Sequence, residues 1–215
     1  MKPPFARQAA TAICAALLAA CASHPAEPPM LSLVDRQCAR QPDLSAPKVL
    51  TLEGDASSVR QPIDNTVSCV EAADGSRSLY RVFLLPQSAR PYMVAIASEP
   101  SGHGLFSPRL ILLDASGAKV REVSRDMFLF HGASLYVALR IHPGEHFLVV
   151  ASDPQSTGQT VSQIVGSTQA TTISNGVGGM FMMYSGKEAN NIYTYAHNGI
   201  VTVSAKVIPG EEGTK

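Results

Sequence analysis

Two short clusters carry the residue types from which metal sites are built. His142-Pro143-Gly144-Glu145-His146 offers two imidazoles and a carboxylate, and Met180-Phe181-Met182-Met183 offers thioethers, which favour Cu(I). Two histidines four residues apart converge on a metal only on a helix, and Pro143-Gly144 predicts a turn instead. Only alternate side chains share one face of a strand, so an apolar strand or a partner-binding surface explains the methionines better. We expect no metal and no cofactor.

Catalytic motifs are absent from the sequence. It contains no nucleophile elbow, no phosphate-binding P-loop and no dinucleotide fingerprint. Its glycine clusters, Gly102-His103-Gly104 and Gly176 to Gly179, open no expected helix and are interpreted as turns. Asp114, before Ala115-Ser116-Gly117, is expected to cap the amides of a turn. We expect no enzyme; a hydrolase with dispersed active-site residues is the alternative.

Three tyrosines are the candidate ligand-binding residues. Tyr193 and Tyr195 are two apart and therefore share a strand face, and Tyr184 lies nearby in the sequence. Their rings could stack on a sugar, although cross-strand packing explains them equally well. The chain has no Trp, the usual aromatic platform for a sugar.

The first twenty residues have the pattern of a secretory signal. Lys2 and Arg7 precede an apolar run from Ala9 to Ala20, which is too short to span a bilayer. Leu18-Ala19-Ala20-Cys21 resembles a bacterial lipobox, whose Cys is diacylated and becomes the first mature residue. An ordinary cleavage site is the alternative. Acyl chains on Cys21 would make a lasting membrane anchor.

The location and charge of the mature protein depend on that signal. Ala22, in place of the Asp typical of inner-membrane lipoproteins, favours the outer membrane, and Ser23 to Met30 is Pro-rich, as a tether should be. We expect a periplasm-facing lipoprotein. The precursor has 17 basic and 17 acidic residues, and losing Lys2 and Arg7 leaves a charge of −2. That balance gives no basic face for nucleic acid.

Two cysteines remain after processing. Cys14 leaves with the signal and Cys21 is acylated, so Cys38 and Cys69 are left in a compartment that favours disulfides. We expect them to be bonded, with two buried free thiols as the alternative. They lack the spacing of a zinc site.

The elements expected to position these residues are short strands separated by turns, without long helical periods. Apolar residues at both parities in Tyr80 to Leu84 indicate an inner strand, and alternation in Ile200 to Val207 indicates a half-exposed one. Arg109 to Asp114 should be buried on both faces, and Asn198-Gly199 is the strongest hairpin signal. The expected strands are Val49–Glu53, Thr66–Glu71, Ser78–Leu85, Tyr92–Ser98, Arg109–Asp114, Lys119–Ser124, Met127–Phe130, Leu135–Ile141, His146–Ser152, Ile192–Ala196 and Ile200–Val207.

The expected fold is all-β, a single antiparallel β-sandwich after a cleaved signal and a flexible tether. Residues 1–20 are the signal, 21–47 the lipidated tether and amino-terminal segment, 48–209 the sandwich and 210–215 a flexible tail. Ser156 to Ser167 is ambiguous between helix and strand. Thr168 to Asn191, rich in Gly, Ser, Thr and Asn, is interpreted as a long loop or irregular hairpin.

One block resembles a known family. Phe106-Ser107-Pro108-Arg109-Leu110-Ile111-Leu112-Leu113-Asp114 is similar to a segment of the maltose operon periplasmic protein family (MalM), and the resemblance extends over about residues 55–160 through Met127-Phe128, Leu139 to Ile141 and Glu145 to Val150. It implies a β-rich periplasmic protein associated with maltodextrin uptake, and no catalytic residues to carry over. The lipobox and the short tail after Val207 depart from the family pattern.

Two functions follow as expectations. The first is a non-catalytic lipoprotein accessory to carbohydrate (maltodextrin) transport, which binds a carbohydrate or an uptake partner. The alternative is a structural or interaction module of an outer-membrane or secretion assembly, acting through the Met/Gly-rich segment or an exposed strand edge.

Overall fold

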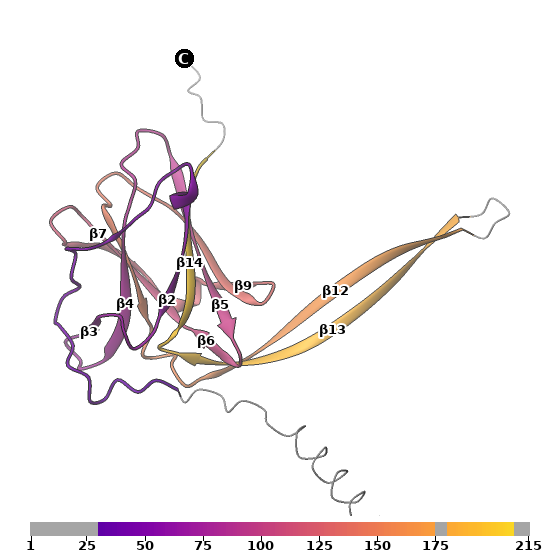
Figure 1. The fold of residues 1–215 in the computed structure, drawn as a ribbon, viewed down its shortest axis with the longest axis horizontal. Helices are drawn as coiled ribbons and strands as arrows, with labels where there is room; N and C mark the ends of the chain where they lie inside the picture. Colours follow the sequence, from indigo (N-terminus) through magenta and orange to yellow (C-terminus); the bar gives the residue numbers. More distant parts are fainter. Residues whose placement is uncertain (1–29, 175–179, 209–215) are drawn as a thin grey trace, which may run out of the picture.

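The computed structural model describes residues 30–174 and 180–208, and of residues 167–174 and 180–185 it describes the backbone alone. The expected signal, Cys21, nearly all of the tether, Gly176 to Gly179 and the tail at 210–215 lie outside the described residues. Two layers of strands face each other, and a long two-stranded ribbon extends away from them (Figure 1). The predicted all-β sandwich is confirmed.

Each strand follows from alternating or continuous apolar residues between turn residues. The strands are β1 Lys48–Val49, β2 Ser58–Ile63, β3 Cys69–Glu71, β4 Arg77–Leu84, β5 Tyr92–Ser101, β6 Gly104–Phe106, β7 Pro108–Leu113, β8 Lys119–Val123, β9 Leu129–His131, β10 Ser134–Arg140, β11 Phe147–Ser152, β12 Thr160–Ser174, β13 Met180–Ala196 and β14 Gly199–Val207. Two 3-10 turns, Asp55–Ser57 and Arg125–Met127, interrupt them.

The two sheets enclose the core. One has six strands, in the order β1-β4-β11-β7-β8 with β3 also on β4; the other has eight and includes β9-β10-β5-β14-β2. Their facing sides bury large aliphatic and aromatic residues, among them Phe83, Leu110, Ile96 and Val203. The pairs are antiparallel except β1 with β4 and β13 with β6.

A second, smaller cluster covers the outer face of the six-stranded sheet. Tyr80, Val82 and Val149 are buried there beneath Leu44 of the amino-terminal segment. The Asp43 amide donates to the Tyr80 hydroxyl at 2.8 Å, which holds that segment in place. This cover explains why β4 is apolar at both parities, as predicted for an inner strand.

Three strand predictions need correction. Arg109 and Ile111 are half-buried, so β7 is buried on its inner face and partly covered on the other. Met127 ends a 3-10 turn, and the strand begins at Leu129 instead. The strands β2 and β6 were not predicted. Alternation in β14 is confirmed, since Val201, Val203 and Ala205 are buried while Thr202 and Ser204 are half-exposed.

The Asn198-Gly199 signal does not mark a hairpin. β13 pairs with β6, whereas β14 pairs with β2 and β5, so the two strands on either side of it are not neighbours. Gly199 is required for a different reason: a Cβ there would lie 2.7 Å from the Phe106 Cβ. The glycine permits close approach of two strands rather than a tight turn.

The ambiguous region at Ser156 to Ser167 and the predicted long loop or irregular hairpin at Thr168 to Asn191 contain one regular two-stranded ribbon, so of these alternatives the hairpin is confirmed and is regular. β12 and β13 pair without a register shift from Thr160 with Thr194 to Ser174 with Met180. Its base continues the sandwich through parallel pairing of β13 with β6. A strand of 15 residues spans about 50 Å at about 3.3 Å per residue, so the ribbon is as long as a small domain. We call β12 and β13 together the arm.

Candidate functional site

The cluster from His142 to His146, predicted to be a turn, makes contacts that stabilise the fold. Gly144 has φ +90° and the Glu145 amide donates to the His142 carbonyl, which makes the predicted turn. The Glu145 carboxylate is buried and pairs with the Arg121 guanidinium, which binds it through two nitrogens. It also accepts the His142 amide at 2.9 Å. Among the described residues, no group of three or more His, Cys, Asp or Glu side chains could hold a metal.

Asp114 caps its turn as predicted. Its carboxylate accepts the amides of Ser116 at 2.8 Å and Ala118 at 2.9 Å, and also the Ser116 hydroxyl. Hydrogen bonds from Ser116 and then from the Ala118 amide hold the pKa of Asp114 below its usual value, because they favour the charged form.

A serine and histidine pair exists that the sequence did not reveal. Ser152 Oγ, at the end of β11, lies 2.9 Å from His197 Nδ1, between β13 and β14. The Leu79 amide donates to the same hydroxyl at 3.0 Å, and Ser152 is fully buried. Burial lowers the pKa of His197, and the Asp153 carboxylate partly opposes that shift. A hydroxyl with no exposed surface cannot attack a substrate, so this pair fastens the two layers together.

The tyrosines do not form an exposed platform. Tyr193 and Tyr195 share a strand face, as expected, but both rings are buried in the main core. The Arg125 guanidinium lies 4.7 Å from the centre of the Tyr195 ring and donates to its hydroxyl. Tyr184 is opposite Ala170 in the arm, and its side chain lies outside the described residues. Cross-strand packing, the other explanation of these residues, accounts for Tyr193 and Tyr195.

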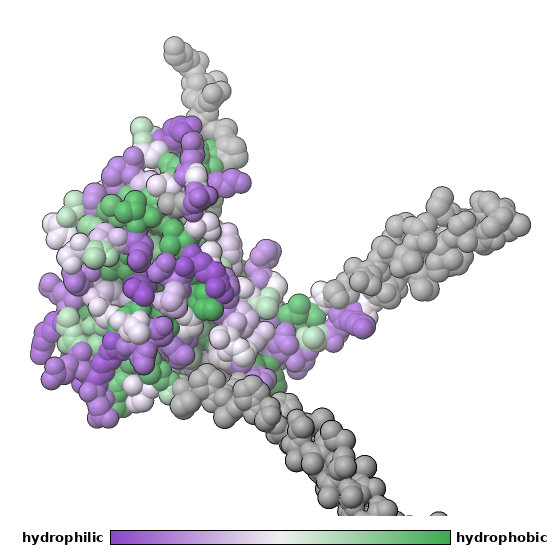
Figure 2. Space-filling view, viewed as in Figure 1, coloured by the Kyte–Doolittle hydropathy of each residue, from purple (hydrophilic) through white to green (hydrophobic). Residues whose placement is uncertain are grey.

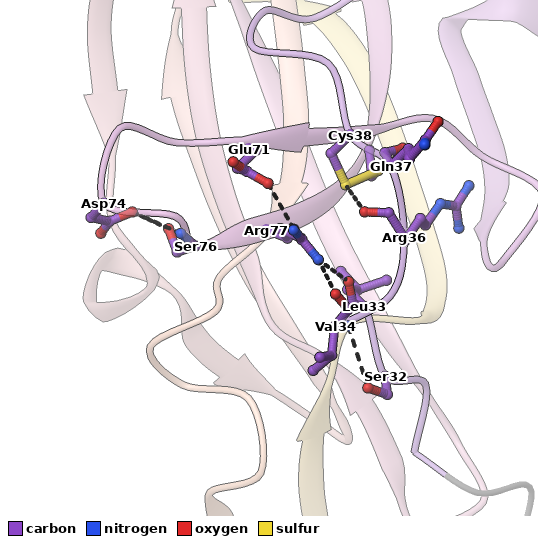
Figure 3. Close-up of polar contacts among 11 residues, drawn as sticks. Ser32, Leu33, Val34, Arg36, Gln37, Cys38, Glu71, Asp74, Ser76 and Arg77 are labelled. Carbon is purple, nitrogen blue, oxygen red and sulfur yellow. Dashed lines mark hydrogen bonds and ion pairs between the residues drawn. A yellow bond between two sulfur atoms is a disulfide. The ribbon is translucent and has the colours of Figure 1, made fainter.

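Besides its contacts at Asp43 and Leu44, the amino-terminal segment is fixed to the sandwich around Cys38, as Figure 3 shows. Cys38 and Cys69 form the predicted disulfide, with an S–S distance of 2.03 Å. The Arg77 guanidinium pairs with the Glu71 carboxylate at 2.8 Å and donates to the carbonyl of Leu33 at 3.0 Å and to that of Val34. We call these contacts the amino-terminal clamp, because they tie the chain from Leu33 onward to β3 and β4.

One polar depression lies at the far end of the sandwich from the arm base. It has a volume of about 470 Å³ and is formed by the loop at 86–92 and the turn at 140–145. Arg90, Arg140 and His142 contribute polar groups to its wall. Tyr92 also lines it, but this ring is buried and donates its hydroxyl to the Pro86 carbonyl at 2.8 Å. Burial raises the pKa of Tyr92 to about 12, so the hydroxyl stays protonated.

The arm is the feature that neither sheet packing nor catalysis explains. The sequence from Pro154 to Gly186 contains no charged residue. Near the base, Ile164 and Ile192 are 63% and 53% exposed on the same face of the ribbon, diagonally opposed across β12 and β13. Figure 2 shows hydrophobic and hydrophilic residues side by side where the arm leaves the body. A ribbon with one uncharged strand and exposed isoleucines is typical of a protein-binding surface.

The edges of the arm are also open. β12 is the last strand of its sheet, and in residues 160–174 it pairs with β13 alone. On its other edge, β13 pairs with β6 at Thr194 to Ala196, and the His103 ring lies 3.3 Å from the Ile192 carbonyl. Unpaired backbone amides and carbonyls along a strand edge are a template for another strand.

No helix in the described part of the chain has both the length and the apolar character needed to cross a membrane. Comparison with protein-family models, with curated proteins and with solved structures finds no match to this chain.

Proposed function

We propose that this chain is a non-catalytic, periplasm-facing lipoprotein that works as an interaction module, in which the sandwich is a rigid base and the arm binds an envelope protein. The observation that carries this proposal is the arm itself: a regular ribbon of 15 paired residues, uncharged along the whole of β12, that projects from a well-packed body. A two-stranded ribbon has no hydrophobic core of its own to hold its backbone in order. Binding to a partner would explain why the arm is nevertheless regular.

The anchor and the location rest on the sequence and on the disulfide. Leu18-Ala19-Ala20-Cys21 supplies the lipid acceptor, and the amino-terminal clamp supplies a fixed point only eight residues after Met30. A disulfide between Cys38 and Cys69 supports an oxidising compartment, since such bonds are rare in the cytosol. Palmitate release from Cys21, read by mass spectrometry, is expected for the wild type and not for Cys21→Ser.

Photo-crosslinking from single positions tests the role of the arm. A photoreactive residue at Ile164 is expected to give a crosslinked species of fixed mass in cells, whereas the same residue at Val120 on β8 is not. Both side chains are more than half exposed, so accessibility is matched. Equal labelling from both positions, or none from Ile164, would contradict the proposal.

An arm-shortened variant completes this test. Gln163 and Asn191 face each other in the register, so they can be joined by Asn-Gly, the sequence preferred in two-residue hairpins. We expect the sandwich to keep its unfolding midpoint, since the described side chains of the part removed, at residues 164–166 and 186–190, belong to neither buried cluster. With the photoreactive residue placed at Ile192, which is exposed and which the variant keeps, the species crosslinked by the full-length arm should disappear. Loss of the fold would show instead that the arm is part of the body.

A carbohydrate-binding role is the second proposal, and it rests on the resemblance to the maltose operon family. The polar depression beside Arg90 and Arg140 is the site that could admit a sugar, because Tyr193 and Tyr195 are buried. Millimolar maltodextrin should then raise the melting temperature of the wild type, and Arg140→Met should reduce that shift. An unchanged melting temperature would remove this role.

A further inference from the structure

We propose that the partner of the arm is a second copy of this chain, and that the free edge of β12 pairs with β12 of that copy, antiparallel, across a two-fold axis. The result is a continuous sheet in the order β13-β12-β12-β13. This inference rests on the proposed role of the arm as a docking element and names its occupant.

The first reason is the state of the ribbon itself. A two-stranded ribbon is marginally stable in water, and three or more strands with a packed face are needed for independent stability. Beyond the contact of β13 with β6, the described backbone of the arm has no third strand. Pairing along β12 would supply two more strands and would satisfy the edge amides and carbonyls over as many as 15 residues.

The second reason is a contrast between this edge and the other edges in the described residues. β1 and β9 are two and three residues long. β8 carries Lys119, Arg121 and Glu122, and β2 carries Arg60 and Pro62. Short length, charge and proline are the features by which sheet edges avoid pairing with other chains. β12 has 15 residues, no charge and no proline, so it lacks all three protections.

The third reason selects a second copy as the occupant. Two identical strands bring identical charges together, which costs free energy wherever like charges face each other. β12 is uncharged from end to end and can therefore face itself in an antiparallel register without such a contact. β13 carries Lys187 and Glu188, and β6 covers its base. A two-fold axis also makes each contact occur twice, as in most soluble homodimers.

Geometry permits full overlap of the two strands. The arm extends clear of the sandwich (Figure 1), so the body does not cover its edge. Antiparallel overlap of Thr160–Ser174 with its copy sets Ser167 opposite itself and Ser162 opposite Thr172. The two bodies then lie at opposite ends of a strand pair about 50 Å long and do not collide.

Single-cysteine crosslinking of the full chain in detergent tests this register. Only a residue at a two-fold axis meets its own copy, so Ser167→Cys should form an intermolecular disulfide at ~10 times the yield of Ser162→Cys or Thr172→Cys alone. An equal mixture of Ser162→Cys and Thr172→Cys should crosslink at about half the yield of Ser167→Cys, because about half of the dimers in the mixture are heterodimers that pair the two cysteines. The Cys38–Cys69 pair is already bonded and does not interfere. Ser162→Cys in the arm-shortened variant, which keeps that residue but lacks most of the β12 edge, is the control for crowding in micelles.

A charge exchange gives an independent readout. Ser167→Lys and Ser167→Glu each place like charges at the axis, and each should raise the dissociation constant of the dimer by ~10-fold or more, measured by sedimentation. Mixing the two variants should restore association as a heterodimer. Equal association of the wild type, both variants and the arm-shortened protein would overturn the inference, as would a monomeric wild type.

The outcomes separate this inference from the proposed function. If Ile164 crosslinks to a different envelope protein while no β12 cysteine crosslinks to its own copy, self-pairing is wrong and the docking role of the arm stands. If Ile164 crosslinks to nothing and the chain is monomeric, both are wrong.

Discussion

Removal of the Cys38–Cys69 disulfide should destabilise the protein by an amount that the sequence separation sets. The bond closes a loop of 31 residues. In the chain-entropy model this closure lowers the entropy of the unfolded chain by about 12 cal/mol/K, which is about 3.7 kcal/mol at 25 °C. A typical domain is stable by about 5–15 kcal/mol, so the bond accounts for a large share of the total.

Urea titration of three samples measures this contribution. The samples are oxidised wild type, reduced wild type and Cys38→Ala/Cys69→Ala, followed by circular dichroism and tyrosine fluorescence, since the chain has six Tyr and no Trp. Reduction opens the link without removing atoms, so it isolates the entropic part. The double variant should be destabilised further because Cys69 is buried and its sulfur would be lost.

The result that would refute this reasoning is specific. If oxidised and reduced wild type unfold at the same urea concentration with the same slope, the loop closure contributes nothing to stability. Reductant should leave the double variant unchanged, and a shift there would reveal an effect of the reagent itself. A steeper slope after reduction is expected, because the open unfolded chain exposes more surface.

Three further substitutions have expected outcomes. Gly199→Ala should lower the free energy of unfolding by about 1–3 kcal/mol, because its Cβ would lie 2.7 Å from the Phe106 Cβ. Gly166→Ala, whose Cβ would meet nothing within 4 Å, should lower it by under about 1 kcal/mol. Equal midpoints of urea unfolding for the two variants would contradict the close approach. Burial lowers the pKa of His197 in the folded state, so the unfolded chain binds the proton more readily and the free energy of unfolding should fall as the pH drops below about 6.5. In urea titrations at pH 7.5 and 5.5, His197→Asn should show a smaller difference in stability between the two pH values than the wild type. An unchanged difference would show that another group causes the pH dependence. Arg121→Met should lower the free energy of unfolding by about 3–5 kcal/mol, since it leaves the Glu145 carboxylate buried without its cation. Lys119→Met, which removes an exposed ion pair, should lower it by under about 1 kcal/mol. Similar losses for the two variants by calorimetry would show that a group other than Arg121 neutralises Glu145.

Local patterns predicted the sandwich well, because a strand buried on one face must alternate. Ile200 to Val207 shows this alternation, and the continuous apolar run of Tyr80 to Leu84 marks an inner strand. The turn capped by Asp114 was predictable because its hydrogen bonds are all within four residues. Such features depend on neighbours in the sequence. The Cys38–Cys69 disulfide was predictable for another reason, since the expected processing would leave only two cysteines.

Features that depend on distant partners could not be predicted in the same way. Asn198-Gly199 has the composition of a hairpin turn, but the strands beside it pair elsewhere in the sheet. The composition of Thr168 to Asn191, rich in Gly, Ser, Thr and Asn, predicts a long loop or irregular hairpin, whereas cross-strand pairing makes the segment part of a regular ribbon. Ser152 and His197 are 45 residues apart, and no motif connects them.

The amino-terminal clamp also determines how the domain carries mechanical load. A pull on the chain ahead of Met30 is met first by the bonds of Arg77 to the carbonyls of Leu33 and Val34, and then by the covalent link at Cys38. From there the force passes into β3 and, through its ladder, into β4 in the interior of its sheet.

Residues 39–68, with β1 and β2, lie in the loop that the disulfide bypasses, so they bear little of that tension. With the bond open, the same pull would run through this loop. It would then peel β1 from β4 and β2 from β14 before it reached β3. Without the disulfide, a pull on the amino-terminal end would separate the strands one after another from that end. With the disulfide, the force is applied through β3 to β4, a strand in the interior of its sheet.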